Sequence, residues 1–384
     1  RATNEDRRNN FIVEVLRNIH VVKALGMESL MVRRYERLQS QSAECSYFVS
    51  SAGSSARGLG QTFSQLIAVA VGAYGSTLVI DGVLTIGGLA ASTLLASRAA
   101  QPLLRALNIW SQFQSANVAR GKVKETLDLP QESDSNAPAI HTIKGKVELK
   151  NVSFAYREAD APLLHDINLR LEPGETIGIA GANGSGKTTL LGLFMGLQVP
   201  TEGQILIDDV DVGSRDVRSL RSQVCYLPQK ATLFQGTIME NLTMFRGEKY
   251  VERAMEISDR LGLHKVIGRM VDGYETRVEH AANSGLPSGI RQRIALVQAL
   301  TLIEKPKLLL FDEANVHLDR ESDALLRELL EEYRGKCSMA VVSHRPSYLG
   351  MADRLCILHD GTVQDANKTN SVHESLEQIE RIYG

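Results

Sequence analysis

The residues best suited to chemistry form a glycine-rich stretch that follows a short apolar run. Residues 181–188 read Gly-Ala-Asn-Gly-Ser-Gly-Lys-Thr, and residues 176–180 before them are apolar and partly β-branched. The apolar run predicts a buried strand, and the stretch matches the phosphate-binding loop pattern in full. Glycines let the backbone close around an anion, and the helix that follows directs its N-terminus at it. The sequence therefore predicts a nucleoside triphosphate site; the alternative is a glycine-rich turn before an ordinary helix.

The predicted loop also supplies side chains for the phosphates and for a metal ion. Lys187 provides a positive charge for the β- and γ-phosphates, and the Thr188 hydroxyl is suited to ligate Mg²⁺. The loop residues expected to contact the nucleotide are Gly181, Asn183, Gly184, Ser185, Gly186, Lys187, Thr188 and Thr189.

Further candidate residues follow other apolar runs. One run ends in Asp312 and Glu313, and another ends in Ser343-His344. A strand end beside a phosphate loop is where a metal-ordering carboxylate is needed, so Asp312 is predicted to order Mg²⁺. Glu313 is predicted to polarise the attacking water as general base. His344 is expected to contact the γ-phosphate, and Gln229 to sense metal and water from a loop.

Composition limits the remaining classes of function. A chain of 384 residues is long enough for two or three domains. Its net charge of −2 gives no argument for nucleic acid, and we expect no nucleic-acid partner. Cys45, Cys225, Cys337 and Cys356 lack C-x-x-C spacing, so isolated reduced thiols are expected rather than a zinc site or disulfides. The chain does not begin with methionine, and we expect it to be truncated at its N-terminus.

The N-terminal third has the pattern of membrane helices. Residues 58–80 are uncharged, which is enough for a bilayer core of about 30 Å. A second uncharged stretch, residues 83–97, follows Asp81 and is rich in small residues, as packed membrane helices are. The predicted spans are about 58–80 and 83–104. Arginines flank the pair and only Asp81 lies at the turn, so the positive-inside rule places both ends in the cytoplasm. The alternative is a buried helical hairpin in a soluble domain.

Flanking segments complete the predicted domain organisation. The segment before the spans is predicted to be an amphipathic helix, with its apolar face formed by Phe11, Val15, Ile19, Val22 and Leu25. Residues 1–127 are expected to form the membrane portion, 128–146 a linker, and 147–384 a nucleotide domain. Apolar runs of strand length alternate with helical stretches there, which predicts an α/β domain with a mostly parallel central sheet.

The order and spacing of these residues resemble the ATP-binding cassette (ABC) family, strongly from Val147 to about Gln364. The resemblance extends to residues 1–127, which look like the last third of an exporter's membrane domain, and is most like bacterial type I secretion and peptide exporters. It implies a membrane helical segment followed by an α/β phosphate-loop domain that hydrolyses ATP. It also implies that Tyr156 stacks on adenine and that Asp319 belongs to the nucleotide site.

The chain departs from the family at its signature sequence. Where the family has Leu-Ser-Gly-Gly-Gln, residues 286–290 read Leu-Pro-Ser-Gly-Ile, and residues 276–282 before them also differ. In this family the signature meets the phosphate loop of a second subunit across a head-to-tail dimer. We expect Ser288 and Gly289 to reach the partner's γ-phosphate after a one-residue shift. Val316 and His317 likewise replace small residues before Asp319.

The sequence thus predicts the C-terminal part of a multi-pass exporter in the bacterial inner membrane. Its cassette domain would lie in the cytoplasm, and its partners would be a second copy, the bilayer and a transported substrate. Peptide, large secreted protein and lipid all remain open as substrates. One alternative is an ATP-binding but weakly hydrolysing cassette of a heterodimeric exporter; the other is a soluble ABC-type ATPase.

Overall fold

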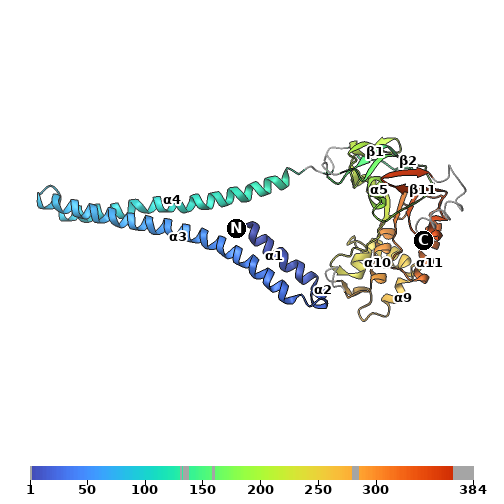
Figure 1. Cartoon of the computed structure of the whole chain (residues 1–384), viewed down its shortest axis with the longest axis horizontal. Helices are drawn as coiled ribbons and strands as arrows, with labels where there is room; N and C mark the ends of the chain where they lie inside the picture. The colour runs from blue at the N-terminus through green and yellow to red at the C-terminus, as the bar shows by residue number, and fades with distance from the viewer. Residues whose placement is uncertain (1, 130–131, 133–137, 158–160, 279–284, 366–384) are drawn as a thin grey trace. The chain divides into compact units, whose positions relative to one another are not determined.

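The computed structural model describes residues 2–129, 132, 138–157, 161–278 and 285–365. The chain divides into two compact units, Arg1–Pro130 and Gln131–Gly384. Part of the predicted linker, part of the altered segment before the signature, and the last residues of the predicted cassette domain lie outside the described residues (Figure 1).

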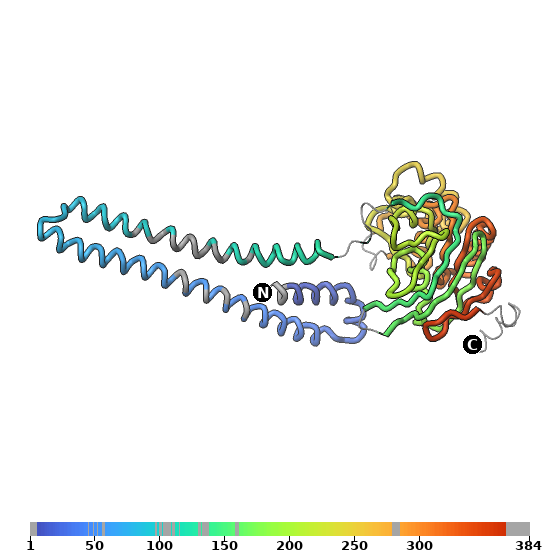
Figure 2. Tube along the Cα trace, turned by 90° about the horizontal axis from the view of Figure 1, so that it is seen from above, coloured from blue at the N-terminus to red at the C-terminus, as the bar shows by residue number. Residues whose placement is uncertain are grey.

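The first unit is entirely helical. Its elements are α1 (Ala2–Arg17), α2 (Ile19–Ala24), α3 (Glu28–Ile80) and α4 (Ile86–Leu127). Figure 2 shows α3 and α4 side by side as an antiparallel hairpin, with α1 running back along the start of α3.

Local sequence explains the turn of this hairpin. The helix α3 ends at Asp81-Gly82, where Gly82 has a φ of +72° that favours glycine. The next helix starts after Thr85, whose Oγ1 accepts a hydrogen bond of 3.1 Å from the N–H of Gly88. A side chain at Gly75 would collide with Leu89, so glycine lets α3 and α4 approach closely.

By length and composition, α3 is the one helix among the described residues that could cross a membrane. The apolar part of α4 covers only Ile86–Ala96, so the second span stays a prediction. The expected amphipathic helix is broken at Asn18 and again at Leu25-Gly26. Phe11 and Val22 are buried as expected, but Leu25 is 66% exposed because the chain turns away there, with Gly26 at a φ of +60°.

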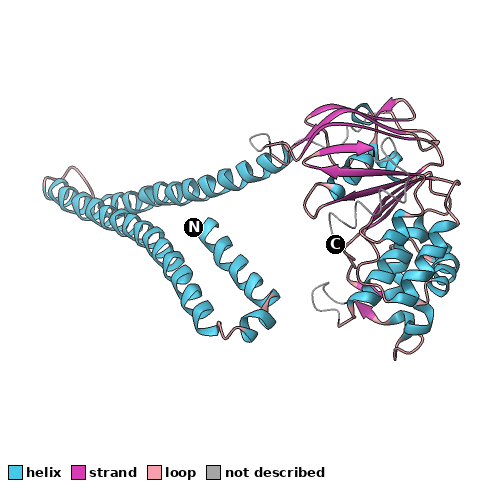
Figure 3. Ribbon diagram, turned by 45° about the vertical axis from the view of Figure 1, so that its right-hand side comes forward, coloured by secondary structure: helices cyan, strands magenta, loops and turns pink. Residues whose placement is uncertain are grey.

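The second unit contains two main sheets (Figure 3). A four-stranded antiparallel sheet has the order β2-β1-β4-β5. Its strands are β1 (Val147–Phe154), β2 (Leu164–Leu171), β4 (Glu202–Ile207) and β5 (Val210–Asp211). This separate sheet was not predicted, because alternating apolar residues indicate a strand without indicating its partners.

A six-stranded sheet has the order β12-β11-β3-β10-β9-β6. All its pairs are parallel except β11 with the edge strand β12. The strands are β3 (Thr176–Gly181), β6 (Val224–Leu227), β9 (Leu308–Asp312), β10 (Ser338–Val342), β11 (Arg354–His359) and β12 (Thr362–Asp365). Every residue of β3, β9 and β10 is buried, as in parallel sheets covered on both faces. The predicted α/β domain with a mostly parallel sheet is confirmed.

Helices cover this sheet and also gather beside it, where Figure 3 shows a helical group. The longer ones are α5 (Lys187–Phe194), α8 (Val251–Arg260), α10 (Ser288–Leu302) and α11 (Arg320–Glu331). Shorter elements are α6 (Val217–Arg221), α7 (Ile238–Leu242), α9 (Leu263–Ile267), α12 (Pro346–Leu349), the strands β7 (Gly236–Thr237) and β8 (Arg277–Val278), and the 3₁₀ turns η1 (Val212–Ser214), η2 (Glu248–Tyr250) and η3 (Gly273–Glu275). One apolar core joins α5 to both sheets, and a second joins α8 and α10 to the parallel sheet.

Candidate nucleotide-binding site

The parallel register brings four chain segments to one edge of the six-stranded sheet. The strands β3, β10, β9 and β6 are consecutive neighbours, and their carboxyl ends point the same way. The phosphate loop follows β3, and Glu313 directly follows β9. His344 comes two residues after β10, and Gln229 two residues after β6. Residues far apart in the sequence therefore meet where ligands bind in open α/β sheets.

Glycines fix the conformation of the phosphate loop. Gly184 and Gly186 have φ values of +81° and +102°, a region that side-chain-bearing residues rarely adopt. A Cβ on Gly186 would lie 2.9 Å from Leu164, and one on Gly181 would lie 2.5 Å from the carbonyl oxygen of Leu358. Gly186 is the N-cap of α5, so the helix begins directly at Lys187.

A pocket of about 280 Å³ opens between the loop and the neighbouring strand ends. Its lining consists of Tyr156, Leu163, Asn183, Gly184, Gly186, Lys187, Thr188, Thr189, Gln229 and Glu313. All of these except Leu163 are predicted site residues. The structure thus brings most of the predicted residues together, although their chemical roles stay predictions.

Lys187 is buried at the base of this pocket, with 7% of its surface exposed. Its Nζ donates hydrogen bonds to the carbonyl oxygens of Gly181 and Ala182 at 2.7 and 3.1 Å. The same atom lies 3.6 Å from Glu313 Oε1. Burial lowers the pKa of Lys187, and the negative charge of Glu313 opposes that shift. The carboxylate therefore helps to keep the lysine charged.

Glu313 is held by side chains from two other segments. Its Oε2 accepts a hydrogen bond from Gln229 Nε2 at 2.8 Å, and its Oε1 lies 2.9 Å from His344 Nε2. The Glu313 N–H donates to the carbonyl oxygen of Val342 at 2.9 Å. Its φ of +46° is uncommon outside glycine and costs of order 1–3 kcal/mol, which persists only where the surroundings enforce it. The carboxylate is fixed rather than free to rotate into solvent.

Asp312 is held from both sides by hydroxyl groups. Its Oδ1 accepts from Thr188 Oγ1 at 3.2 Å, and its Oδ2 accepts from the Tyr226 hydroxyl at 3.0 Å. Burial raises the pKa of Asp312, and these two hydrogen bonds oppose the shift. Sequence reasoning missed Tyr226, although it lies on the strand that leads to Gln229 and so ends at the same sheet edge.

Tyr156 lies at the mouth of the pocket. Its side chain is 64% exposed, and its hydroxyl lies 2.9 Å from Thr189 Oγ1. Its ring is nearly perpendicular to the Phe154 ring, at a centroid distance of 5.0 Å. The face of an exposed ring held in this way is available for stacking on a base, as the family resemblance implies.

Seven predicted residues do not line the pocket. Gly181, Ser185, Asp312 and His344 are adjacent in sequence or bonded to residues that do, which leaves Ser288, Gly289 and Asp319. Ser288 and Gly289 begin α10, with Pro287 as the N-cap residue rather than in the first turn. Asp319 is the N-cap of α11, where its Oδ1 accepts from the N–H of Ser322 at 2.8 Å. This hydrogen bond holds the pKa of Asp319 below its usual value. Within one chain its visible role is structural, and its predicted contact with nucleotide stays a prediction.

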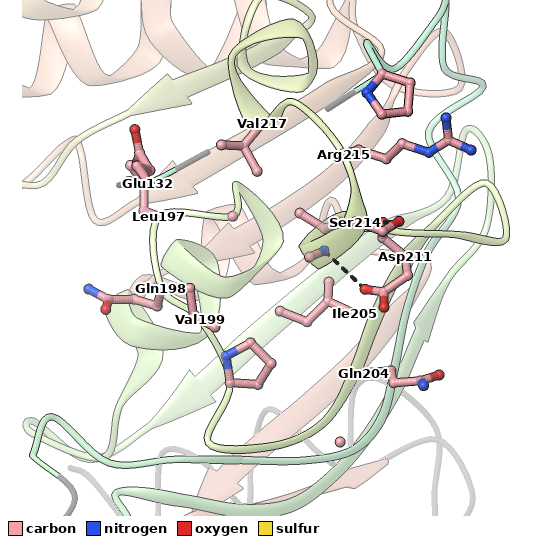
Figure 4. Close-up of a pocket in the computed structure, with 16 residues that line it drawn as sticks. Glu132, Leu197, Gln198, Val199, Gln204, Ile205, Asp211, Ser214, Arg215 and Val217 are labelled. Carbon is pink, nitrogen blue, oxygen red and sulfur yellow. Dashed lines mark hydrogen bonds between the residues drawn. The ribbon is translucent and has the colours of Figure 1, made fainter. Parts of the chain in front are cut away.

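A larger pocket, of about 750 Å³, lies beyond the C-terminal end of α5 (Figure 4). It is lined mainly by small and apolar residues such as Leu197, Val199 and Ile205. The Asp211 carboxylate at its side accepts a hydrogen bond from the N–H of Gly213 at 3.0 Å. None of the predicted site residues lines it, so the smaller pocket at the phosphate loop is the candidate for chemistry.

The strand–loop–helix geometry and the carboxylates beside it define a phosphate-loop nucleotide-binding domain. Comparison with protein families identifies the family to which this domain belongs. A model described as "ABC transporter" matches residues 164–316, and one described as "ABC transporter transmembrane region" matches residues 1–102. The chain belongs to the ABC transporter family, and joins part of the transmembrane region to the family's ATP-binding domain.

Individual relatives agree with this assignment. The chain is 30% identical over 366 residues to the cyclolysin secretion/processing ATP-binding protein of Bordetella pertussis, covering 95% of this chain and 50% of that protein. It is 31% identical over 384 residues to the leukotoxin export ATP-binding protein of Aggregatibacter actinomycetemcomitans, covering 99% and 53%. The chain thus spans about half the length of these relatives. A bacterial Atm1-family ABC exporter, solved with ATP bound, shares the fold with a TM-score of 0.86 at 23% identity, covering 98% of this chain and 69% of that one.

Replacing Lys187 tests the phosphate loop. We expect Lys187→Ala to weaken ATP binding about ten- to hundredfold, because a hydrogen bond to a charged group is worth about 1.5–3 kcal/mol. Binding of a fluorescent ATP analogue measures the effect. Lys146→Ala is the matched control, since the Lys146 side chain pairs with Asp209 outside the pocket. Equal affinities of the two variants would contradict the assignment.

Proposed function

We propose that this chain is the C-terminal part of an exporter that couples ATP hydrolysis to transport across the bacterial inner membrane. The observation that carries the proposal is the Glu313 carboxylate, fixed by Gln229 and His344 beside the phosphate loop. A fixed carboxylate in that place is suited to accept a proton from an attacking water.

The proposed reaction uses each of the clustered side chains. Water attacks the γ-phosphorus and gives its proton to Glu313, while the bond from the γ-phosphorus to its bridging oxygen breaks and releases ADP. Lys187 and the N–H groups of the phosphate loop stabilise the charge on the phosphate oxygens. His344, 3.2 Å from Asn183 Oδ1 and 2.9 Å from Glu313 Oε1, lies where it can contact the γ-phosphate. Gln229 orients Glu313 and the water.

The residues also fit Mg²⁺. Thr188, Asp312 and Gln229 provide a hydroxyl, a carboxylate and an amide oxygen, which are the hard oxygen ligands that Mg²⁺ prefers. The described residues hold no group of three or more His, Cys, Asp or Glu side chains suited to a metal. Mg²⁺ commonly keeps waters and substrate phosphates as ligands instead of a protein cage. When bound, it would neutralise charge on the β- and γ-phosphates.

A second copy of the chain would complete each site in a head-to-tail dimer. Ser288 is exposed in the first turn of α10, whereas Ile290 is half-buried against the core. The side chain at the position of the family's glutamine thus packs inward, and the serine faces outward. This supports the one-residue shift, in which Ser288 of the partner subunit and the start of its helix face the γ-phosphate.

Transport is inferred from the other unit. Only 6% of the most apolar window of α3 is buried, which suits lipid and argues against a soluble ATPase. The positive-inside rule places both ends of the hairpin, and so the ATP-binding domain, in the cytoplasm. The printed names of the relatives concern toxin secretion and export, which supports a peptide or protein as the transported substrate.

A second candidate function is an ATP-binding but weakly hydrolysing cassette in a heterodimer. The altered signature favours it, since Pro287 replaces the family's serine and removes one N–H from the helix start. The complete catalytic cluster in this chain favours hydrolysis by a homodimer. The two candidates differ in one measurable property, the rate of hydrolysis by the purified parental chain.

The general base is tested by Glu313→Gln. The amide has the same shape but cannot accept the proton, so ATP binding should persist while turnover falls to background and the dimer stays closed. ATPase rate and sedimentation with ATP measure the two effects. Glu304→Gln, at an exposed position outside the pocket, is the control and should keep parental turnover. Parental turnover in Glu313→Gln would exclude Glu313 as the base.

The signature is tested by Ser288→Ala. Losing one hydrogen bond to a charged phosphate should slow hydrolysis by about ten- to hundredfold without abolishing it. Restoring Leu-Ser-Gly-Gly-Gln at residues 286–290 should leave the rate equal or faster. If the parental chain shows no hydrolysis above the Glu313→Gln background, the weakly hydrolysing heterodimer becomes the better account.

A further inference from the structure

Gln292 is a fully buried polar residue that the catalytic cluster does not include. It lies on α10, one helical turn after Ser288, and none of its surface is exposed. Its Nε2 donates two hydrogen bonds of 2.8 Å, one to the carbonyl oxygen of Pro228 and one to that of Ala314. Its Oε1 is buried with no hydrogen-bond partner among the described residues. Such a group is costly to bury, so its two donated bonds must matter to the structure around it.

The two carbonyl groups adjoin the catalytic cluster. Pro228 directly precedes Gln229, and Ala314 directly follows Glu313. Gln229 and Glu313 are themselves joined by a 2.8 Å hydrogen bond. One amide group on α10 therefore fixes the backbone on both sides of the bond that orients the proposed base.

The start of α10 packs closely against the chain segment that follows Glu313. A Cβ on Gly289 would lie 2.9 Å from the carbonyl oxygen of His317, so no side chain fits between them without movement. The first turns of α10 thus adjoin residues 314–317 at two points, by close approach at Gly289 and by a hydrogen bond from Gln292. The exposed Ser288 belongs to the same rigid arrangement.

We propose that Gln292 is a positioning residue that ties the helix start carrying Ser288 to the catalytic pair Gln229 and Glu313. When the partner's nucleotide docks at Ser288 and displaces α10, the displacement then shifts the backbone next to the proposed base of the same chain. The inference rests on the proposed hydrolysis, because it assigns Gln292 an effect through Glu313.

The test compares two buried glutamines of the same helix. Gln292→Met removes both donors at similar volume. Gln298→Met is the control, since Gln298 is also buried but donates to Asn241 Oδ1 at 3.4 Å, apart from Pro228 and Ala314. We expect Gln292→Met to lower the hydrolysis rate about tenfold or more with ATP affinity unchanged within twofold, and Gln298→Met to keep the rate within twofold.

Two further readouts separate positioning from a general structural defect. In the Glu313→Gln background, Gln292→Met should cause no further loss of the residual single-turnover rate. The rate of amide hydrogen exchange in residues 229–232 and 314–318 should rise in Gln292→Met and not in Gln298→Met, whether or not the parental chain hydrolyses ATP. If Gln292→Met does not fold, Gln292→Glu is the substitute variant, because it keeps the side-chain size with at most one donor. We expect the same changes in hydrolysis rate and hydrogen exchange for it.

An unchanged rate, or the same loss in both backgrounds, overturns the proposal, as does unchanged exchange in the two segments. A parental chain that does not hydrolyse ATP overturns the proposed function instead, and the exchange measurement then decides whether Gln292 fixes the two segments.

Discussion

The arrangement of the site depends on how the Glu313 carboxylate is held. Lys187 comes from the helix after β3, Gln229 from the segment after β6 and His344 from the segment after β10; all three lie within 3.6 Å of its oxygens. These contacts exist only because β6, β9, β10 and β3 are parallel neighbours. A change of order or direction would take the lysine, the amide or the imidazole away from the carboxylate.

Much of this could be predicted from the sequence, because the signals were local. The phosphate loop combines glycine spacing with a lysine and a threonine at fixed positions, and the strands β3, β6 and β9 are short apolar runs with clear ends. Asp312 and Glu313 could be placed beside the phosphate loop because the carboxyl ends of parallel strands share one edge of the sheet. The break at Asp81-Gly82 followed from the loss of apolar residues together with a glycine.

Other features could not be predicted because they depend on tertiary contacts. Tyr226 and Gln292 sit in a strand and a helix where their polarity carries no positional signal; only the structure shows Tyr226 against Asp312 and Gln292 between two carbonyl groups. The antiparallel sheet depends on which strands pair, and Leu25 is exposed because Gly26 redirects the chain. For Asp319, the family resemblance indicates a contact with nucleotide, which stays a prediction, and the structure adds its role as the N-cap of α11.

The central claim is that each ATP site is completed by a second copy in head-to-tail orientation. Cross-linking tests it most directly, with Asn183→Cys on one copy and Ser288→Cys on the other in the Glu313→Gln background. Cys45 is replaced by serine in both copies, and Cys225, Cys337 and Cys356 are buried, so they should contribute little to the cross-links. The account predicts a mixed cross-link between the two variants that requires ATP. Its absence in a mixture that binds ATP, or cross-links only between identical positions, would contradict the account.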